Sequence, residues 1–299
     1  MTPRPTTGRG EPVDIVQPVT WAEALAAKAE RPGLLPIAGG TDVMVDINFD
    51  RCRPEGLLDL TRVEEIGSWS VDDGVVRLGA GVTYAQVESD LADLIPGLAM
   101  ASRTVGSPQI RNRGTVAGNL GSASPAGDAH PPLLAVGATV EVESVRGSRK
   151  VEAADFFVGV KRNALEPDEL IRGVRVPVTG GPQQFAKIGT RNAMVIAVAS
   201  FAVALHPGSR RVGTGIGSAA PTPRRASAAE DLLAGELDWD GRSPVGAPVV
   251  RRFGELVAAA ADPIDDVRGS AAYRRHALAV MAARTATWAW DEYRTGEGS

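Results

Sequence analysis

Two glycine-rich stretches carry the residue types that could bind a phosphate group. The first occupies residues 37–42 (IAGGTD) and the second residues 114–128 (GTVAGNLGSASPAGD). Glycine lets the backbone approach a ligand closely and adopt positive φ, so that successive N–H groups can form a concave site for an anion. Side chains that could add hydrogen-bond donors are those of Thr41, Asn119, Ser122 and Ser124.

Asp128, at the end of the second stretch, has a different expected role. A carboxylate would repel a phosphate, but it could accept hydrogen bonds from sugar-like hydroxyls. A single glycine turn is usually an ordinary turn, whereas two of them on successive α/β units favour a shared ligand. The pair therefore predicts a site for a phosphate-containing organic cofactor.

A third glycine motif, residues 215–220, fits the dinucleotide-binding pattern GxGxxA. Pro221 and Pro223 follow at once, so no helix can begin where a pyrophosphate would need a helix N-terminus. We therefore expect these glycines to have a structural role.

The cysteine and histidine content limits metal chemistry. The 299-residue chain has one cysteine, Cys52, and three widely separated histidines, His130, His206 and His276. Iron–sulfur clusters usually take four cysteines, and structural zinc sites take several Cys or His ligands. We expect no metal site, so a redox role must rest on an organic cofactor or on partner chains.

Charge and hydropathy argue against two classes of partner. A net charge of −4 is not typical of nucleic-acid binding. No apolar run approaches the 18 residues of a membrane span. Residues 1–10 are polar and proline-rich, unlike a secretory signal, and are expected to be disordered. These features predict a cytoplasmic protein that contacts neither nucleic acid nor membrane.

Hydrophobic periodicity predicts two α/β units followed by an α+β unit. Thr20 and Glu23 form a capping-box pattern for a helix that ends before Pro32. Residues 103–132 show little periodicity and are expected to form a long functional loop. The other expected elements are helices at 43–47, 83–94, 226–234, 250–261 and 271–292, and strands at 34–38, 57–60, 75–80, 138–142, 170–177, 183–188, 196–205 and 211–216.

Several segments together resemble the FAD-binding medium subunit of the molybdenum hydroxylases, the xanthine dehydrogenase and carbon monoxide dehydrogenase family. The resemblance runs from about residue 11 to residue 290, and the combination of motifs is specific. The matching segments are AGGTD (38–42), RNRGTVAGN (111–119) followed by Ser124, Pro125 and Asp128, FFVG (156–159), PDELI (167–171) and DVRGSAAYR (266–274).

The resemblance implies an α+β fold. A two-subdomain FAD-binding domain of the vanillyl-alcohol-oxidase/PCMH type would precede an α+β C-terminal domain with a three-stranded antiparallel sheet and helices. The implied bounds are 1–60 and 61–180 for the two FAD-binding subdomains and 183–292 for the C-terminal domain.

The resemblance also implies a non-covalent FAD site. Both loops would wrap the pyrophosphate and adjacent groups, and Asp128 would hold a hydroxyl. Ile171 would pack on the flavin, and Lys187 would lie near the isoalloxazine and favour the anionic reduced flavin. Residues 190–193 would lie where an acceptor approaches. No catalytic residue is implied, and the implied FAD-binding residues are Ile37, Ala38, Gly39, Gly40, Thr41, Asp42, Thr115, Val116, Gly118, Asn119, Ser124, Asp128, Ile171 and Lys187.

The function implied by the resemblance is that of an oxidoreductase subunit. In the family, a molybdenum cofactor on a large partner oxidises the substrate, and [2Fe–2S] clusters on a small partner relay the electrons. FAD then passes them to NAD⁺ or another acceptor. A dimer of heterotrimers is expected, and the large partner would select xanthine, an aldehyde, carbon monoxide or a heterocycle.

One departure from the family pattern leaves an alternative open. The family usually has Gly-Gly-Asn in the second loop, and this chain has Ala117-Gly118-Asn119. If position 117 needs positive φ, alanine costs about 1 kcal/mol and weakens FAD binding. An FAD-free structural subunit is therefore a second hypothesis.

A stand-alone flavoprotein oxidase or reductase is a third hypothesis. Covalent flavin oxidases tether FAD through a His or Cys near the first loop, where this chain has Thr41 and no such residue before Cys52. His130 is expected to be structural, although it could approach the flavin. The arginines of the last helix, Arg274, Arg275 and Arg284, are expected at the surface or in an interface.

Overall fold

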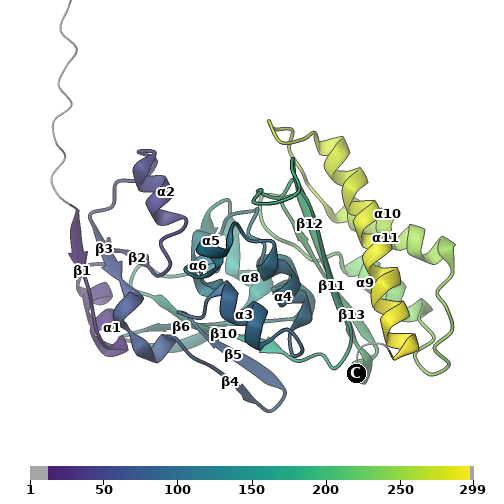
Figure 1. The fold of residues 1–299 in the computed structure, drawn as a ribbon, viewed down its shortest axis with the longest axis horizontal. Helices are drawn as coiled ribbons and strands as arrows, with labels where there is room; N and C mark the ends of the chain where they lie inside the picture. The colour runs from purple at the N-terminus through teal and green to yellow at the C-terminus, as the bar shows by residue number, and fades with distance from the viewer. Residues whose placement is uncertain (1–12, 297–299) are drawn as a thin grey trace, which may run out of the picture.

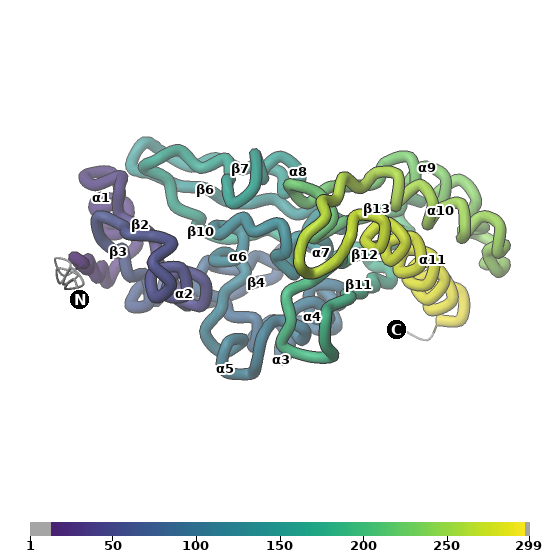
Figure 2. Tube along the Cα trace, turned by 90° about the horizontal axis from the view of Figure 1, so that it is seen from above, coloured from purple at the N-terminus to yellow at the C-terminus, as the bar shows by residue number. Residues whose placement is uncertain are grey.

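The computed structural model describes residues 13–296, which form an elongated molecule of two domains (Figure 2). The expected disorder of residues 1–10 lies outside the described residues. The expected α+β fold is confirmed, because a domain with two sheets precedes a domain with a three-stranded antiparallel sheet and helices.

The first sheet is small and parallel, with strand order β1 (Asp14–Val16), β3 (Gly56–Asp59), β2 (Leu35–Ile37). Helix α1 (Trp21–Glu30) precedes β2, and helix α2 (Val43–Asn48) follows it. The Thr20 side chain accepts from the backbone N–H of Glu23, and the Glu23 side chain completes the expected capping box. The β2–α2 connection is the first glycine loop.

The second sheet is antiparallel, and its strand order is β4 (Trp69–Asp72), β5 (Val75–Gly79), β10 (Leu170–Pro177), β6 (Thr139–Ser144), β7 (Gly147–Glu152). Strands β1, β4 and β7 were not expected. Their residues are mostly exposed, so they lack the apolar pattern that identifies a strand from sequence.

The expectation of a long loop at 103–132 was wrong in part. The segment between β5 and β6 folds into short helices, α3 (Tyr84–Asp90), α4 (Pro96–Arg103), α5 (Pro108–Arg111), α6 (Val116–Ser122) and α7 (His130–Val136). Helices of four and seven residues, begun by Pro108 and by the Thr115 cap, are too short to show an amphipathic repeat. A short helix α8 (Ala153–Phe156) and a hairpin of β8 (Phe157–Gly159) and β9 (Arg162–Asn163) complete this domain.

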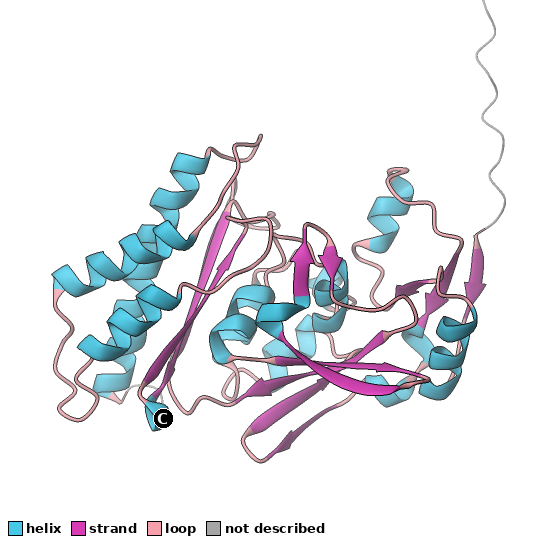
Figure 3. Ribbon diagram, turned by 180° about the vertical axis from the view of Figure 1, so that it is seen from behind, coloured by secondary structure: helices cyan, strands magenta, loops and turns pink. Residues whose placement is uncertain are grey.

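The third sheet, β11 (Gln183–Ile188), β12 (Ala199–His206), β13 (Arg211–Gly217), is the expected antiparallel meander. It lies between α4 and α7 of the first domain and the C-terminal helices α9 (Ser227–Glu236), α10 (Ala247–Ala260) and α11 (Ala271–Thr295) (Figures 1 and 3). Strand β12 is therefore buried on both faces. Ala202 and Ala204 belong to the core of the first domain, whereas Phe201, Val203 and Leu205 belong to the second core.

The glycines of β13 explain the motif at 215–220. A Cβ on Gly213 would collide with the Ala135 carbonyl oxygen, and one on Gly215 with the Pro131 carbonyl oxygen. Alternate glycines thus let the backbone of α7 lie directly against the sheet, as the expected structural role requires.

Arg274 of α11 corrects the expectation that the arginines of the last helix lie at the surface or in an interface. Its side chain is buried and donates to the carbonyl oxygens of Val198 and Ser218 and to Asp266 Oδ1. Arg275 and Arg284 are exposed. Among the described residues, no helix has both the length and the apolar character needed to cross a membrane.

Candidate functional site

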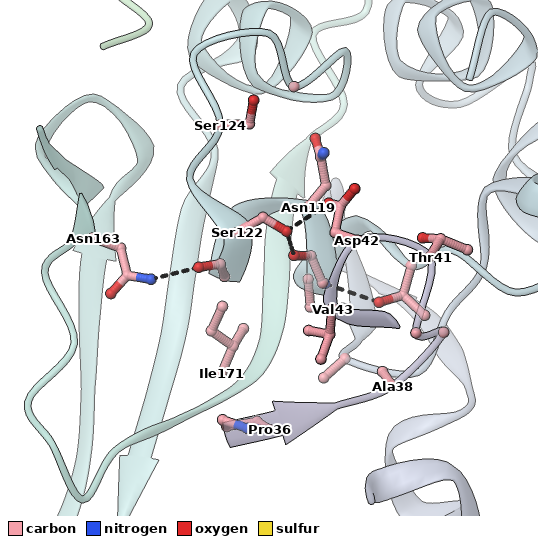
Figure 4. Close-up of a pocket in the computed structure, with 18 of the residues that line it drawn as sticks. Pro36, Ala38, Thr41, Asp42, Val43, Asn119, Ser122, Ser124, Asn163 and Ile171 are labelled. Atoms are coloured by element: carbon pink, nitrogen blue, oxygen red, sulfur yellow. Dashed lines mark hydrogen bonds between the residues drawn. The ribbon is translucent and has the colours of Figure 1, made fainter. Parts of the chain in front are cut away.

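A cavity of about 610 Å³ lies where the two glycine loops meet (Figure 4). Its other walls come from the end of α1, from residues 163–171 and from Met194, Val195 and Ile196 of the C-terminal domain. Ligand cavities in proteins commonly have volumes of about 300–1,000 Å³. The cavity therefore has the size expected for an extended organic cofactor.

The first loop is held against the second by direct backbone contact. Gly40 has φ +74°, a conformation that glycine adopts without strain. A Cβ on Gly39 would collide with the Arg113 carbonyl oxygen, so only glycine permits this approach. Ser122 of α6 also donates to Asp42 Oδ2 at 2.7 Å (Figure 4). The two loops consequently form one wall.

The second loop leads into α6. Thr115 caps this helix, because its Oγ1 accepts from the Gly118 N–H at 2.9 Å. Asn163 donates to the Gly121 carbonyl at 2.9 Å and fixes the end of α6 (Figure 4). The side chain of Ile171, on β10, also lines the cavity, 3.8 Å from where a Cβ on Gly121 would lie.

Ala117 has none of the strain that would have argued against FAD binding. It is the second residue of α6, and it is absent from the residues with positive φ between 13 and 296. Its methyl group is buried and lines the cavity. The cost in FAD affinity that a positive φ at Ala117 would have caused therefore does not arise.

Asp128 and Lys187 form a buried ion pair at the cavity. Lys187 Nζ donates to Asp128 Oδ2 at 2.6 Å and to the Thr104 carbonyl at 3.2 Å. Burial raises the pKa of the Asp128 carboxyl to about 6, although the Lys187 ammonium opposes this rise. Asp128 lines the cavity and Lys187 lies behind it, so Lys187 meets the site through the carboxylate.

His130 is buried behind the second loop and forms a hydrogen bond to its backbone. Its Nε2 lies 3.1 Å from the Asn119 carbonyl oxygen, to which it donates, and its ring packs at a tilt of 46° against Phe157, with centroids 4.4 Å apart. Burial lowers the pKa of His130 to about 4, against the opposing hydrogen bond to the Asn119 backbone. A fully buried neutral imidazole that does not line the cavity has the structural role expected of it.

The expected FAD-binding residues fall into two groups. Three do not line the cavity: Val116 is buried in the core, Ile37 ends β2, and Lys187 lies behind Asp128. The others line it together, namely Ala38, Gly39, Gly40, Thr41, Asp42, Thr115, Gly118, Asn119, Ser124, Asp128 and Ile171. Their contact with FAD stays a prediction.

Other lining residues were not expected from the sequence, among them Lys28, Tyr84, Val105, Leu165 and Met194. Tyr84 directly follows the Thr83 cap after β5, which is the one local signal that could have identified it. The remainder reach the cavity through tertiary packing of distant segments.

The lining has the donor and acceptor set that a flavin nucleotide requires. Gly39 and Gly40 line the cavity, and backbone without side chains is the kind of surface that holds phosphate groups. Tyr84 Oη, Asn119 Oδ1 and Asp128 Oδ1 are buried without a hydrogen-bond partner among residues 13–296. Buried polar atoms are normally paired, so these three atoms can form hydrogen bonds with a ligand in the cavity. The residues present fit FAD.

Two family models cover most of the chain. The FAD binding domain in molybdopterin dehydrogenase matches residues 11–179, and the CO dehydrogenase flavoprotein C-terminal domain matches residues 184–289. The second match covers nearly all of the β11–β13 sheet and of the helices that cover it, and it ends within α11.

Curated relatives agree with these matches. The nicotine 6-hydroxylase medium subunit of Paenarthrobacter nicotinovorans is 34% identical over 83% of this chain and 87% of that protein. The nicotinate dehydrogenase FAD-subunit of Eubacterium barkeri is 37% identical, but the match spans only 54% of this chain and 57% of that protein.

A solved structure shows the same fold. The match is a chain of carbon monoxide dehydrogenase from Hydrogenophaga pseudoflava that lacks the Mo-pyranopterin moiety of its cofactor. The TM-score is 0.86 and the identity 26%, over 94% of this chain and 98% of that one. The chain therefore belongs to the family of FAD-binding medium subunits of molybdenum-containing dehydrogenases, and it is an oxidoreductase subunit.

Proposed function

We propose that this chain is the electron-transfer subunit of a heteromeric molybdenum hydroxylase. The observation that carries the proposal is the cavity between the two glycine loops, whose unpaired donor and acceptors suit FAD. When bound, FAD would accept electrons from partner [2Fe–2S] clusters and deliver them to NAD⁺ or another acceptor.

The chain's own residues position this cofactor and limit its contact with water. Gly39 and Gly40 bring two backbones close to the diphosphate, and the buried Asp128 carboxylate accepts from a hydroxyl. Ile171 provides an apolar surface for the ring system. Lys187 holds Asp128 in place and contributes a positive charge behind it.

The acceptor would approach beside the C-terminal domain. Met194, Val195 and Ile196 are the part of that domain that lines the cavity, and Met194 and Ile196 are themselves exposed. They directly follow residues 190–193, the segment expected near the acceptor. An exposed apolar border of this kind suits a transient encounter with a planar acceptor.

Partner chains complete the proposed route. A large subunit would carry the molybdenum cofactor and select the substrate, and a small subunit would carry the [2Fe–2S] clusters, in a dimer of heterotrimers in the cytoplasm. Support comes from the single cysteine, which cannot by itself ligate such clusters, and from relatives described as medium subunits.

Co-purification followed by anaerobic NADH titration tests the proposal. We expect a yellow complex of three different chains, with flavin released to the supernatant by trichloroacetic acid. Mass spectrometry identifies the large subunit, and the substrate class of that subunit should then bleach the absorbance near 450 nm.

The NADH arm identifies the acceptor. Bleaching by NADH indicates NAD⁺, whereas bleaching by substrate alone indicates another acceptor. A colourless complex would contradict the proposal, as would an isolated chain that turns over NADH without partners. Flavin retained in the acid pellet would favour the covalent oxidase hypothesis instead.

A further inference from the structure

Tyr84 presents a buried hydroxyl that the rest of the protein does not use. Its side chain is 2% exposed and lines the cavity. Its Oη has no hydrogen-bond partner among residues 13–296. Phenylalanine would fill the same space without burying an unpaired polar atom, so packing alone does not explain a tyrosine here.

The position of the Tyr84 ring is fixed by the start of α3 and by the start of the second loop. Thr83 and Gln86 form a capping box at the start of α3. The Tyr84 N–H donates to the Gly114 carbonyl at 3.0 Å. The ring edge lies 3.4 Å from where a Cβ on Gly114 would be, so Tyr84 packs directly against the start of the second loop. These contacts therefore hold the Tyr84 hydroxyl at the cavity.

The surroundings make this hydroxyl a donor. Burial raises the pKa of Tyr84 well above its usual value, and the Asp128 and Asp42 carboxylates add to the rise. The phenol thus keeps its proton, and what it lacks is an acceptor. Asn119 Oδ1 and Asp128 Oδ1, which line the same cavity, lack donors. A chain of hydroxyls joined to phosphate oxygens supplies both kinds of partner.

We propose that Tyr84 is an FAD-binding residue whose hydroxyl donates a hydrogen bond to the ribityl–diphosphate part of the cofactor. This inference rests on the FAD-binding part of the proposed function and not on the route of the electrons. If the complex bound FAD but passed no electrons to NAD⁺ or another acceptor, the assignment of Tyr84 would still hold. It adds to the two glycine loops a third element, α3, that contacts the cofactor.

The test is Tyr84→Phe in the full-length chain, purified with the subunits that accompany it and freed of flavin. Titration with FAD, followed by quenching of flavin fluorescence, should give a Kd about tenfold higher than that of the wild type. The melting temperature of the flavin-free variant should equal or exceed that of the wild type, because an unpaired hydroxyl has been removed.

Tyr273→Phe is the matched control, because Tyr273 lies on α11, is exposed and does not line the cavity. It should change neither the Kd nor the melting temperature. An unchanged Kd in Tyr84→Phe would overturn the proposal. So would a lower melting temperature of the flavin-free variant, which would mean that the hydroxyl is paired within the protein.

The absorption spectrum of bound FAD distinguishes the contacted part of the cofactor. Because the hydroxyl is assigned to the ribityl–diphosphate chain, the band positions should be the same in Tyr84→Phe and in the wild type. A shifted band at full saturation would place the contact on the ring system and refute the assignment.

Discussion

Lys187 Nζ lies 2.6 Å from Asp128 Oδ2, and this ion pair joins the C-terminal sheet to the second loop of the cavity. The two side chains are only 6% and 9% exposed. Each charge has therefore lost most of its hydration, and each depends on the other for compensation. The same pair that orders the cavity wall thus links the two domains.

Removing one partner of this pair should destabilise the protein far more than removing both. Lys187→Met leaves a buried carboxylate without its cation, and we expect a loss of about 3–5 kcal/mol in the free energy of unfolding. The double variant Asp128→Asn/Lys187→Met should recover most of that loss, because no charge stays buried. Urea denaturation of the flavin-free protein at pH 7 measures both.

The exposed ion pair between Arg31 and Asp14 is the control for the Asp128–Lys187 variants. It joins β1 to the end of α1, and both of its side chains are well exposed. Arg31→Met should cost less than about 1 kcal/mol. Equal losses at the two pairs would show that water reaches Lys187 and would contradict the buried arrangement.

Asp128 should make the protein less stable as the pH rises. Its pKa is about 6 in the folded protein because of burial, against an ordinary value of 3.8. The folded state therefore holds this proton more tightly, and the resulting stability is lost as the pH rises through 6. Relative to Asp128→Asn, the wild type should lose about 1 kcal/mol between pH 5 and pH 7. If the stability of the wild type relative to Asp128→Asn rose with pH instead, the pKa of Asp128 would be lowered in the folded protein. The effect of the Lys187 charge on that pKa would then be larger than the effect of burial.

His130 should produce the opposite trend. Burial lowers its pKa to about 4, from an ordinary value of 6.5, so the unfolded chain takes up the proton first. Relative to His130→Gln, the wild type should lose about 2 kcal/mol as the pH falls from 7 to 5. Paired urea titrations at the two pH values measure this. A flat difference would indicate an imidazole that reaches solvent.

The sequence was sufficient for those parts of the fold whose signals are local. The capping box at Thr20 and the apolar run that predicts a strand at 196–205 each report on a nearby stretch of chain. The structure confirms the capping box and places a strand, β12, at Ala199–His206. The polar strand β7 and the four-residue helix α5 lack such signals, because neither buries a regular apolar face. They form because neighbouring segments position them.

The candidate site was predictable to a similar extent. Glycines that must accept close backbone approach, such as Gly39, are visible as a motif. Which neighbours of the motif line the cavity was not visible: Ile37 and Val116 belong to the predicted set but do not line it, and their contact with FAD stays a prediction. The Lys187–Asp128 pair joins residues 59 apart in sequence, and only the packing of β11 against the first domain brings them together.

Gly39→Ala should separate the two loops and abolish the cavity's cradle. Gly39 has no positive φ, so the effect comes from collision of the new methyl group with the Arg113 backbone and not from backbone strain. Overpacking of this kind costs about 1–3 kcal/mol, and because the collision lies at the site, FAD affinity should fall at least tenfold.

Gly235→Ala is the matched control: it lies in α9, and a Cβ there would meet nothing within 4 Å. That variant should bind FAD normally and gain up to about 1 kcal/mol from helix propensity. Titration with FAD and urea denaturation of both variants decide the matter, and normal FAD affinity in Gly39→Ala would show that the first loop does not contact the cofactor.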